Sequence, residues 1–521
     1  MSDANEAAIE DHPNTGITEG PEVEAADQQS EPDNGHQVAA EAGTDTQRDD
    51  VVKPGSPFFD IPSFLIVAER CVAAAQSTVR EHETREQRVL KRFSVAEVAE
   101  ALNCNRNYLY KYLLDLDGAP TGVMRGRENT FSIDDIMKLR ALNETRKTAR
   151  PRNMLYWRKP GDKLPVITFC SQKGGTGKSL SAAHFCHGLS MTYGLRCALI
   201  DADPQGTCSL YFADDSIHVG NAFVDSFTDF MGVPPAPETT RIVHTDEDLN
   251  DFWKPTPWPG TKILPGGPSI MEGDLSLFSM TRSSNPADRR VWRYLRDALK
   301  RWSDIIPPRT DPADFVNEAG EWQEEVYQTA LNETVDVIVI DTAPSLTLSQ
   351  LNAVYAADML VLPQTMKGFD LAALRTYLSS LNDYFEMTQN EPNADTFAEM
   401  KSFILPTMIP TSTDADIRSV GEIFSSNPEV ISPIFYYRSD GASNAFREYK
   451  SVYEYQPDYN RKASISKFLA NANAVNEAIC KRALPHLPPR GYASAFIREN
   501  YNDGTLPSWT FEDVEISEDN V

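Results

Sequence analysis

The 521-residue sequence has no run of about 18 apolar residues, so it offers no candidate for a membrane-spanning helix. Its N-terminus lacks the basic-then-apolar layout of a secretory signal peptide. The seven cysteines are scattered without a Cys-x-x-Cys pair, which disfavours zinc and iron–sulfur sites and suits a reducing cytoplasm. No internal repeat and no Ser/His/Asp or Cys/His arrangement is visible. These absences predict a cytoplasmic protein with no membrane association, and the length predicts two or three domains.

Positive charge is scarce, because 49 Lys and Arg face 76 Asp and Glu, for a formal net charge of −27. Residues 1–50 contain 14 of the acids and one Arg, with few large apolar residues and no periodicity. We therefore expect 1–56 to be a disordered acidic tail. The tail is either a solvated segment or an interaction arm that excludes or mimics nucleic acid.

The scarce cations are concentrated in two places. Residues 138–163 hold nine Lys or Arg against two acids, which predicts contact with a phosphate backbone or, alternatively, a basic linker. A second group lies in 438–467 and is either a DNA-contacting or a solvated face. Its members are Arg438, Arg447, Lys450, Arg461, Lys462 and Lys467.

A glycine-rich segment, Cys170-Ser-Gln-Lys-Gly-Gly-Thr-Gly-Lys-Ser179, lies between an apolar strand-like run at 166–169 and a helical pattern at 180–193. Such a turn directs several backbone N–H groups at phosphate oxygens. Lys178 is expected to reach the β- and γ-phosphates, and the Ser179 hydroxyl to reach Mg²⁺. The expected nucleotide-binding residues are Lys173, Gly174, Gly175, Thr176, Gly177, Lys178, Ser179 and Leu180.

Two later apolar runs end in carboxylates. One is Cys197-Ala-Leu-Ile-Asp-Ala-Asp-Pro-Gln-Gly206, and the other is Val335-Asp-Val-Ile-Val-Ile-Asp341-Thr-Ala-Pro-Ser345. Carboxylates at the ends of parallel strands lie at the edge of the sheet where ligands bind. Further strands are expected at 357–363, 403–408 and 433–437, and residues just beyond the ends of these strands, such as 364–365 and 406–408, could approach a nucleotide. The alternation with helices predicts an α/β fold with a doubly wound parallel sheet over 160–485.

Residues 93–140 predict a winged helix-turn-helix. Apolar residues at helical spacing over 95–102 follow Ser94 as N-cap, and a turn at 103–105 leads to a second helix at 106–116 with Leu109, Tyr112 and Leu113 inward. A hairpin over 121–130 and a capped helix over 131–140 follow. The expected DNA contacts are Arg106, Asn107, Tyr110 and Lys111 on the second helix and Arg125 and Arg127 on the hairpin. A plain helical packing domain is the alternative.

The remaining segments give less specific expectations. A long helix over 61–92 either dimerises or docks within the chain, so the helical domain is placed at 57–150. Residues 305–325 are acidic and contain prolines, and they form an insertion without an assigned role. His184 and His187 lie on one helix without further ligands, so they are expected to be structural. An acidic C-terminal extension is expected over 486–521.

The pattern Lys-Gly-Gly-x-Gly-Lys-Ser/Thr, with Lys173 as the extra lysine, resembles the deviant phosphate loop of the ParA/MinD class of P-loop ATPases. The Asp-x-Asp-Pro-Gln-Gly and Asp-Thr-Ala-Pro-Ser motifs resemble the other motifs of the class. The three motifs, preceded by a segment that resembles a MerR-like helix-turn-helix, make the chain similar to large partition ATPases such as the RepA proteins of repABC replicons. The resemblance implies ATP and Mg²⁺ as ligands. It implies catalytic roles for Lys173, Lys178 and Asp203, which orients water, and a metal shell of Ser179, Asp201 and Asp341.

The same resemblance implies a DNA-partitioning ATPase whose ATP-bound homodimer binds DNA. Lys173 then acts across the dimer interface, and a ParB-like centromere-binding protein stimulates slow hydrolysis and release. Operator binding by the helix-turn-helix makes the protein an autorepressor located on the nucleoid. Two alternatives stay open: a transcription regulator that senses nucleotide, and a MinD-like positioning ATPase. The acidic end of the chain, 508–521, disfavours the latter because it is wrong for an anionic membrane.

Overall fold

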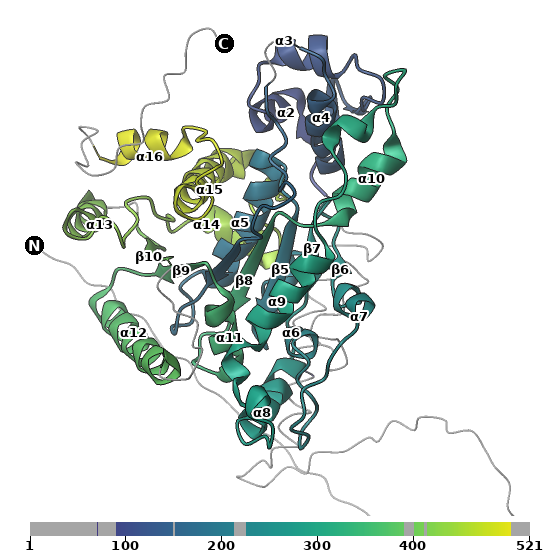
Figure 1. Ribbon diagram of the computed structural model, residues 1–521. Coiled ribbons are helices and arrows are strands. Elements are labelled where there is room, and N and C mark those ends of the chain that lie inside the picture. The colour runs from purple at the N-terminus through teal and green to yellow at the C-terminus, as the bar shows by residue number, and fades with distance from the viewer. Residues whose placement is uncertain are drawn as a thin grey trace, which may run out of the picture. The chain divides into compact units, whose positions relative to one another are not determined.

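The computed structural model describes Arg70 and residues 90–148, 152–212, 226–389, 401–410 and 414–501. Within them a seven-stranded sheet has the order β10-β9-β4-β8-β5-β7-β6, and every pairing is parallel except that of β6 with β7 (Figure 1). The strands are β4 (Val166–Phe169), β5 (Cys197–Ala202), β6 (Lys254–Pro255), β7 (Lys262–Leu264), β8 (Val337–Thr342), β9 (Met359–Gln364) and β10 (Lys401–Pro406). The predicted α/β fold with a mostly parallel sheet is therefore confirmed.

The central strands are buried on both faces, which explains why they read as continuous apolar runs. In β8, Val337 and Val339 belong to the core beneath α5 and α15, whereas Ile338 and Ile340 belong to the core beneath α9 and α11. Figure 1 shows these helix pairs on opposite faces of the sheet. The sheet is thus enclosed by two apolar layers, and its polar residues are confined to the strand ends.

Helices connect the strands. Those of this domain are α5 (Lys178–Tyr193), α6 (Phe227–Phe230), α7 (Asp246–Asp251), α8 (Ser269–Met280), α9 (Tyr294–Ile305), α10 (Glu324–Glu333), α11 (Leu348–Ala356), α12 (Gly368–Gln389), α13 (Asp414–Ser426), α14 (Asp440–Arg447), α15 (Lys462–Ala483) and α16 (Tyr492–Asn500). The buried Glu477 on α15 accepts hydrogen bonds from the Arg490, Gly491 and Ala493 N–H groups at the start of α16. Residues 487–501 therefore share the main core.

The expected strand at 433–437 is wrong. Only two isolated bridges form there, Ile404 with Ile431 and Ile409 with Tyr437. Pro433 has no N–H to donate to a ladder. The Ser432 hydroxyl also accepts a hydrogen bond from the Ile434 N–H and donates one to the Ile434 carbonyl. These bonds form a local turn in place of a strand.

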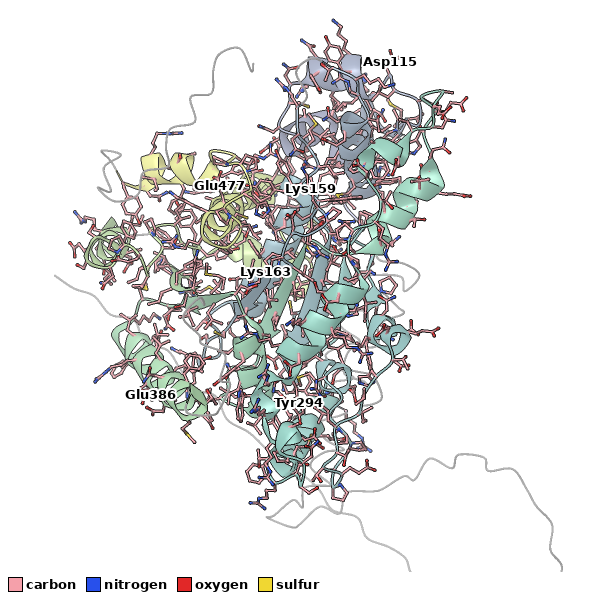
Figure 2. The ribbon with its side chains drawn as sticks, viewed as in Figure 1. Asp115, Lys159, Lys163, Tyr294, Glu386 and Glu477 are labelled. Carbon is pink, nitrogen blue, oxygen red and sulfur yellow. The ribbon has the colours of Figure 1, made fainter. Side chains whose placement is uncertain are left out.

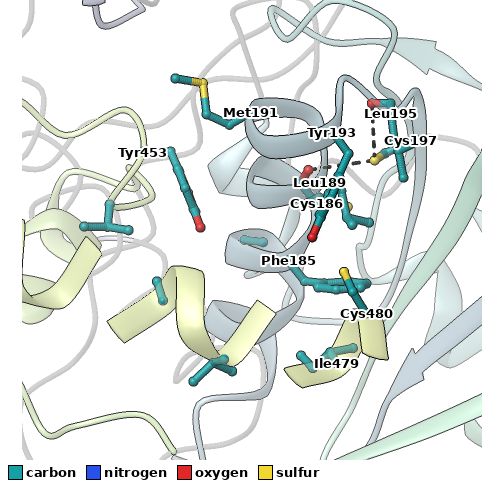
Figure 3. Packing of buried hydrophobic residues seen from close by; sticks show 14 of the residues in the cluster. Phe185, Cys186, Leu189, Met191, Tyr193, Leu195, Cys197, Tyr453, Ile479 and Cys480 are labelled. Atoms are coloured by element: carbon teal, nitrogen blue, oxygen red, sulfur yellow. Dashed lines mark hydrogen bonds between the residues drawn. The ribbon is translucent and has the colours of Figure 1, made fainter. Parts of the chain in front are cut away.

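Helix α5 is the most deeply buried helix next to the glycine-rich loop. Figure 3 shows Phe185, Leu189 and Tyr193 of α5 packed with Ile479 and Cys480 of α15. The Cys197 thiol donates to the Cys186 and Leu195 carbonyls in the same core. Because the loop leads directly into α5, this packing fixes the direction in which the loop points.

The two histidines of α5 are core residues, each 1% exposed, as expected of structural histidines. The His184 Nδ1 lies 2.8 Å from the Leu180 carbonyl, and its Nε2 accepts the Val452 N–H at 3.0 Å. The ring is therefore neutral, with the proton on Nδ1. Burial lowers the pKa of His184 to about 4.

A smaller layer precedes the sheet. It contains β1 (Phe93–Ser94), α2 (Val95–Ala101), α3 (Arg106–Tyr108), a π-helical turn (Leu109–Leu113), β2 (Val123–Arg125), β3 (Glu128–Phe131) and α4 (Ile133–Glu144). Ser94 and Ser132 each form a capping box with the residue three positions on. The helical segment after the turn ends at Leu113, not at 116. Tyr112 is 37% exposed, so its predicted inward position is wrong.

Only the last part of the expected long helix at 61–92 lies within the continuously described residues. There, 90–92 are not helical, because Leu90 to Arg92 lead into β1. Most of the remaining expected helix, the acidic segment 1–56 and residues 502–521 lie outside the described residues.

The basic stretch 138–163 does not form one continuous phosphate-contacting stripe, because some of its cations are used inside the molecule, whereas Lys147, Lys159 and Lys163 are exposed. Arg140 is fully buried and donates to the carbonyls of Ala101 and Met191 at 2.6 Å. Burial, followed by the charge of Arg490, lowers the pKa of Arg140 to about 9. Arg158 donates to the Val335 carbonyl and the Thr334 hydroxyl. A count of charges could not reveal this burial.

The insertion 305–325 packs against the small layer. Phe315 and Tyr327 form an aromatic cluster with Trp157 and Trp322. The Trp322 N–H donates to Asp117, and Lys138 pairs with Glu324 at 2.6 Å. The insertion therefore attaches α4 and its neighbours to the sheet domain.

No helix among the described ranges is long and apolar enough to cross a membrane.

His184 predicts a pH dependence of stability. In the unfolded chain a histidine takes up a proton below about pH 6.5, whereas the folded His184 stays neutral until about pH 4. Between these pH values the unfolded state binds more protons than the folded state, so the free energy of unfolding decreases as the pH is lowered. From pH 7 to pH 5, the free energy of unfolding measured in urea should decrease by about 2 kcal/mol more for the wild type than for His184→Gln. Equal losses in both proteins would contradict the neutral buried ring.

Candidate functional site

The glycine-rich loop leaves β4 at Phe169 and enters α5 at Lys178. Gly175 and Gly177 have positive φ angles of 75° and 83°, a backbone region that other residues rarely adopt. A Cβ atom at Gly174 or Gly175 would meet no heavy atom within 4 Å, so the loop faces open space. All eight predicted nucleotide-binding residues lie in this loop and in the first turn of α5. Their geometry fits a cradle of backbone N–H groups for phosphate.

A segment beyond β10 supports the loop from outside. The Thr407 hydroxyl donates to the Thr176 carbonyl at 2.7 Å, and the Thr407 N–H donates to the Gln364 carbonyl at 2.9 Å. Met408 has a φ of 55°, and its Cε lies 3.5 Å from the position of a Cβ on Gly177. The sequence predicts that residues past this strand approach the nucleotide, and the structure places them against the loop.

Three carboxylates lie beside the loop. Asp201 and Asp341 are paired in register on β5 and β8 and are both fully buried, and Asp203 is 6% exposed. The Ser209 N–H and hydroxyl each donate to Asp201 at 2.7 Å. Burial raises the pKa of Asp201, and hydrogen bonds from Ser209 lower it in part.

Asp341 is the carboxylate of the site whose burial is least offset by hydrogen bonds. Within the described part of the chain, neither of its carboxylate oxygens has a hydrogen bond of normal geometry. Burial and then the charge of Asp201 raise its pKa well above the usual range, and Lys178 and the Ser179 hydroxyl lower it. A buried acceptor without a donor is costly. The arrangement thus fits a cation that the polypeptide alone does not supply.

The donor set is oxygen-based, which Mg²⁺ prefers. No group of three or more His, Cys, Asp or Glu side chains in the described ranges is arranged to hold a metal by itself. Ser179, Asp201 and Asp341 are the predicted Mg²⁺ ligands, and their oxygens suit an ion that is usually shared with phosphate oxygens. Their role as metal ligands stays a prediction.

Two residues of the site escaped the sequence analysis. Ser209 fixes Asp201, and its hydroxyl also accepts the Gly266 N–H at 2.9 Å. A Cβ on Gly266 would lie 2.6 Å from the Asp203 carbonyl oxygen and 2.7 Å from the Asp201 Cγ. The Gly-Gly-Pro segment before α8 was a visible signal, but only the fold shows that it closes over the carboxylates.

Lys173 is held within its own chain. Its ammonium forms an ion pair with Asp370, the third residue of α12, and Asp370 also accepts a hydrogen bond from the Thr365 hydroxyl. The Lys173 side chain is 46% exposed, whereas that of Asp370 is 5% exposed. These hydrogen bonds hold the pKa of Asp370 below its usual range. Lys173 is thus positioned at the surface by a buried carboxylate.

The predicted DNA contacts lie apart from the nucleotide loop, on the small layer. All six are exposed: Arg106, Asn107, Tyr110, Lys111, Arg125 and Arg127. Arg125 lies on β2, and Arg127 lies in the turn before β3. Arg146 and Arg152 stack on the Tyr108 ring within 5.2 and 4.9 Å of its centroid. The positions are compatible with a DNA-reading role, which stays a prediction.

Loop, helix and buried carboxylates at the mouth of a parallel sheet define a P-loop nucleotide-binding domain. Residues 167–477 match the family model described as "CobQ/CobB/MinD/ParA nucleotide binding domain", which covers more than half of the chain. The chain belongs to this family, and the predicted membership in the ParA/MinD class is confirmed.

Several relatives carry replication or partition names. A protein of Sinorhizobium fredii named "Putative replication protein A" is 23% identical over 75% of this chain and 86% of its own length. Protein SopA of Escherichia coli K12 is 27% identical over 42% of this chain and 46% of its own length. The chromosome partitioning protein ParA of Caulobacter vibrioides is 26% identical over 42% of this chain and 62% of its own length. A solved structure titled "Partition Protein" is 16% identical, covers 78% of this chain and 99% of its own, and has a TM-score of 0.45.

Gly266→Ala should destabilise the fold without nucleotide. The new methyl group would press on the Asp203 backbone and the Asp201 carboxylate, and overpacking of this kind costs about 1–3 kcal/mol. Gly174→Ala is the matched control, because its methyl group meets open space and its φ is not positive. Urea unfolding of both variants measures the difference. Equal stabilities would contradict the close contact at Gly266.

Proposed function

We propose that this protein is an ATP-dependent DNA-partitioning ATPase, in which ATP and Mg²⁺ bind at the loop and hydrolysis switches affinity for DNA. The observation that carries the proposal is Asp341, a buried carboxylate beside Lys178 and Ser179 that accepts no hydrogen bond of normal geometry from the described part of the chain. Family membership and the partition names of the relatives support the DNA role. The proposed locations are the cytoplasm and the nucleoid.

In this proposal, different residues of the chain bind the phosphates, hold Mg²⁺ and orient the attacking water. The loop N–H groups and Lys178 hold and orient the β- and γ-phosphates, and Ser179, Asp201 and Asp341 hold Mg²⁺. The ion, when bound, neutralises charge that develops on the phosphates. Asp203 accepts the Gln205 N–H with one carboxylate oxygen at 2.9 Å. In this proposal its other oxygen orients a water. Burial raises the pKa of Asp203, and the hydrogen bond from the Gln205 N–H and the charge of Lys178 oppose this shift.

The active form in this proposal is a homodimer. Lys173 leaves Asp370 and reaches the nucleotide of the partner subunit, so the Asp370 pair is the state before dimerisation. A ParB-like centromere-binding partner stimulates hydrolysis and thereby releases DNA. The exposed side chains of the small layer bind an operator, and the protein then represses its own operon.

The main alternative is a transcription regulator in which the nucleotide only sets operator affinity. The exposed Arg106 and Lys111 on the second helical segment favour it, whereas the buried Asp203 favours turnover. A MinD-like positioning role is the weaker alternative, because residues 508–521 are acidic.

DNA binding in two nucleotide states tests the proposal. Anisotropy of a labelled random-sequence duplex at fixed salt should show tight binding with ATP and Mg²⁺ and weak binding with ADP and Mg²⁺. Lys178→Ala should weaken ATP binding about 10- to 100-fold, since charged hydrogen bonds contribute ~1.5–3 kcal/mol, and should abolish the difference between the states. Equal binding in both states by the wild type would refute the switch. Steady-state hydrolysis separates the regulator alternative, which predicts nucleotide binding without turnover.

Lys173→Ala should separate binding from dimerisation. The Lys173 ammonium is tied to Asp370 at the surface, so ATP affinity measured by titration should change less than about threefold. Sedimentation with ATP and Mg²⁺ should show a dimer for the wild type and a monomer for the variant. Asp370→Asn is the control, because it frees Lys173 and should favour the dimer. An ATP-dependent dimer of Lys173→Ala would contradict the cross-interface role.

A further inference from the structure

A cationic hollow lies at the edge of the sheet opposite the glycine-rich loop, where β4, β9 and β10 begin. Three adjoining cavities of about 270, 530 and 580 Å³ share Lys163 in their walls. Figure 2 labels Lys163 and, above it, Lys159. We call this region the basal hollow. Its cations are Lys159, Lys163, Arg296, Lys300, Lys401 and Arg482, in addition to the internally bonded Arg158.

Most carboxylates of the basal hollow are already engaged. Asp358 pairs with Lys163 at 2.5 Å and accepts the Val166 N–H. Asp336 pairs with the buried Arg196 at 2.7 Å. Asp162 accepts the Lys159 N–H with its carboxylate, and Asp304 is exposed on the rim. The wall therefore has a surplus of positive charge, in a chain whose net charge is −27.

Three lysines carry this surplus. Lys159, Lys300 and Lys401 are exposed, and their ammonium groups form no ion pair or hydrogen bond with any described residue. Each belongs to a different one of the three cavities. Such a spread does not suit one small anion, which needs donors that converge on a point. It suits a linear polyanion that passes over Lys163 and meets successive cations.

Helix ends do not account for these lysines. Helices α11 and α15 end at Ala356 and Ala483 beside the basal hollow, and the carbonyl dipoles of a last turn attract cations. Arg482, in the last turn of α15, is directed away from these carbonyls, because it donates to the Pro428 and Ile431 carbonyls in the segment after α13. Lys300 lies within α9 and Lys401 begins β10, so neither lies at a helix C-terminus.

We propose that the basal hollow binds the phosphodiester backbone of duplex DNA, independent of sequence. The inference rests on the proposed function, since it presumes that the chain binds DNA. It combines Lys159 and Lys163 of the basic stretch 138–163 with Lys300 and Lys401, which the sequence did not single out. The basic group at 438–467 is the competing surface. Its Arg461, Lys462 and Lys467 are also exposed, and Lys467 lies 5.5 Å from the Tyr437 ring centroid.

Two charge-matched double variants of the full chain decide between the surfaces. Lys300→Ala with Lys401→Ala removes two lysines of the basal hollow, and Lys462→Ala with Lys467→Ala removes two of the competing group. Anisotropy of a random-sequence duplex is measured from 50 to 200 mM salt, with ATP and with ADP. Each lost phosphate contact reduces the slope of log affinity against log salt by about 0.9. The first variant should reduce it by about 2, and the second by less than about 0.5.

Unchanged slope in the first variant would overturn the proposal, as would equal reductions in both, which reflect net charge alone. Urea unfolding and ATP hydrolysis should match the wild type, because both lysines are exposed and lie at the opposite edge of the sheet from the loop. A variant that loses stability but keeps its DNA affinity would also overturn the proposal. Failure of the wild type to bind DNA in either nucleotide state would instead refute the proposed function itself.

Discussion

Two carboxylates buried side by side, Asp201 and Asp341, are the constraint on which the rest of the site depends. They occupy paired positions on adjacent strands, so neither can move away from the other without disrupting the sheet. Like charges in a buried site raise each other's pKa and destabilise the ionised pair. Ser209 stabilises Asp201 by donating two hydrogen bonds to it. Gly266 has no side chain and therefore leaves room for the Asp201 carboxylate. Asp341 accepts no hydrogen bond of normal geometry from the described residues and is offset only by Lys178 and the Ser179 hydroxyl, so it fits a bound cation.

The same constraint explains why α5 is held so firmly. Lys178, the first residue of α5, acts on Asp341 and Asp203 only if the helix keeps its direction, and a helix of 16 residues spans about 24 Å. His184 ties the middle of α5 to Val452, and Arg140 binds the Met191 carbonyl in its last turn. Arg140 also binds Ala101 at the end of α2. The buried helix therefore connects the nucleotide loop to the small layer that precedes it.

The sequence was most informative where local pattern decides the structure. Strands β4, β5 and β8 were located within about two residues, since continuous apolar runs ending in Asp or a glycine loop have few other interpretations. Ser209, Gly266 and Asp370 were missed because each acts on a residue distant in the sequence. The strand expected at 433–437 failed for a local reason that composition hides, the missing N–H of Pro433.

Charge was the least reliable guide, and the reason is physical. A count of Lys and Arg over 138–163 treats all nine as equal, yet Arg140 is fully buried on carbonyl oxygens and Arg158 bonds to Thr334 and Val335 just before β8. Arg140 holds the small layer against α5, and both side chains are engaged in internal hydrogen bonds. Lys300 and Lys401 lie in unremarkable sequence, and only the fold brings them to one hollow. An electrostatic surface is thus a property of burial and partners, and segment charge becomes informative only after both are known.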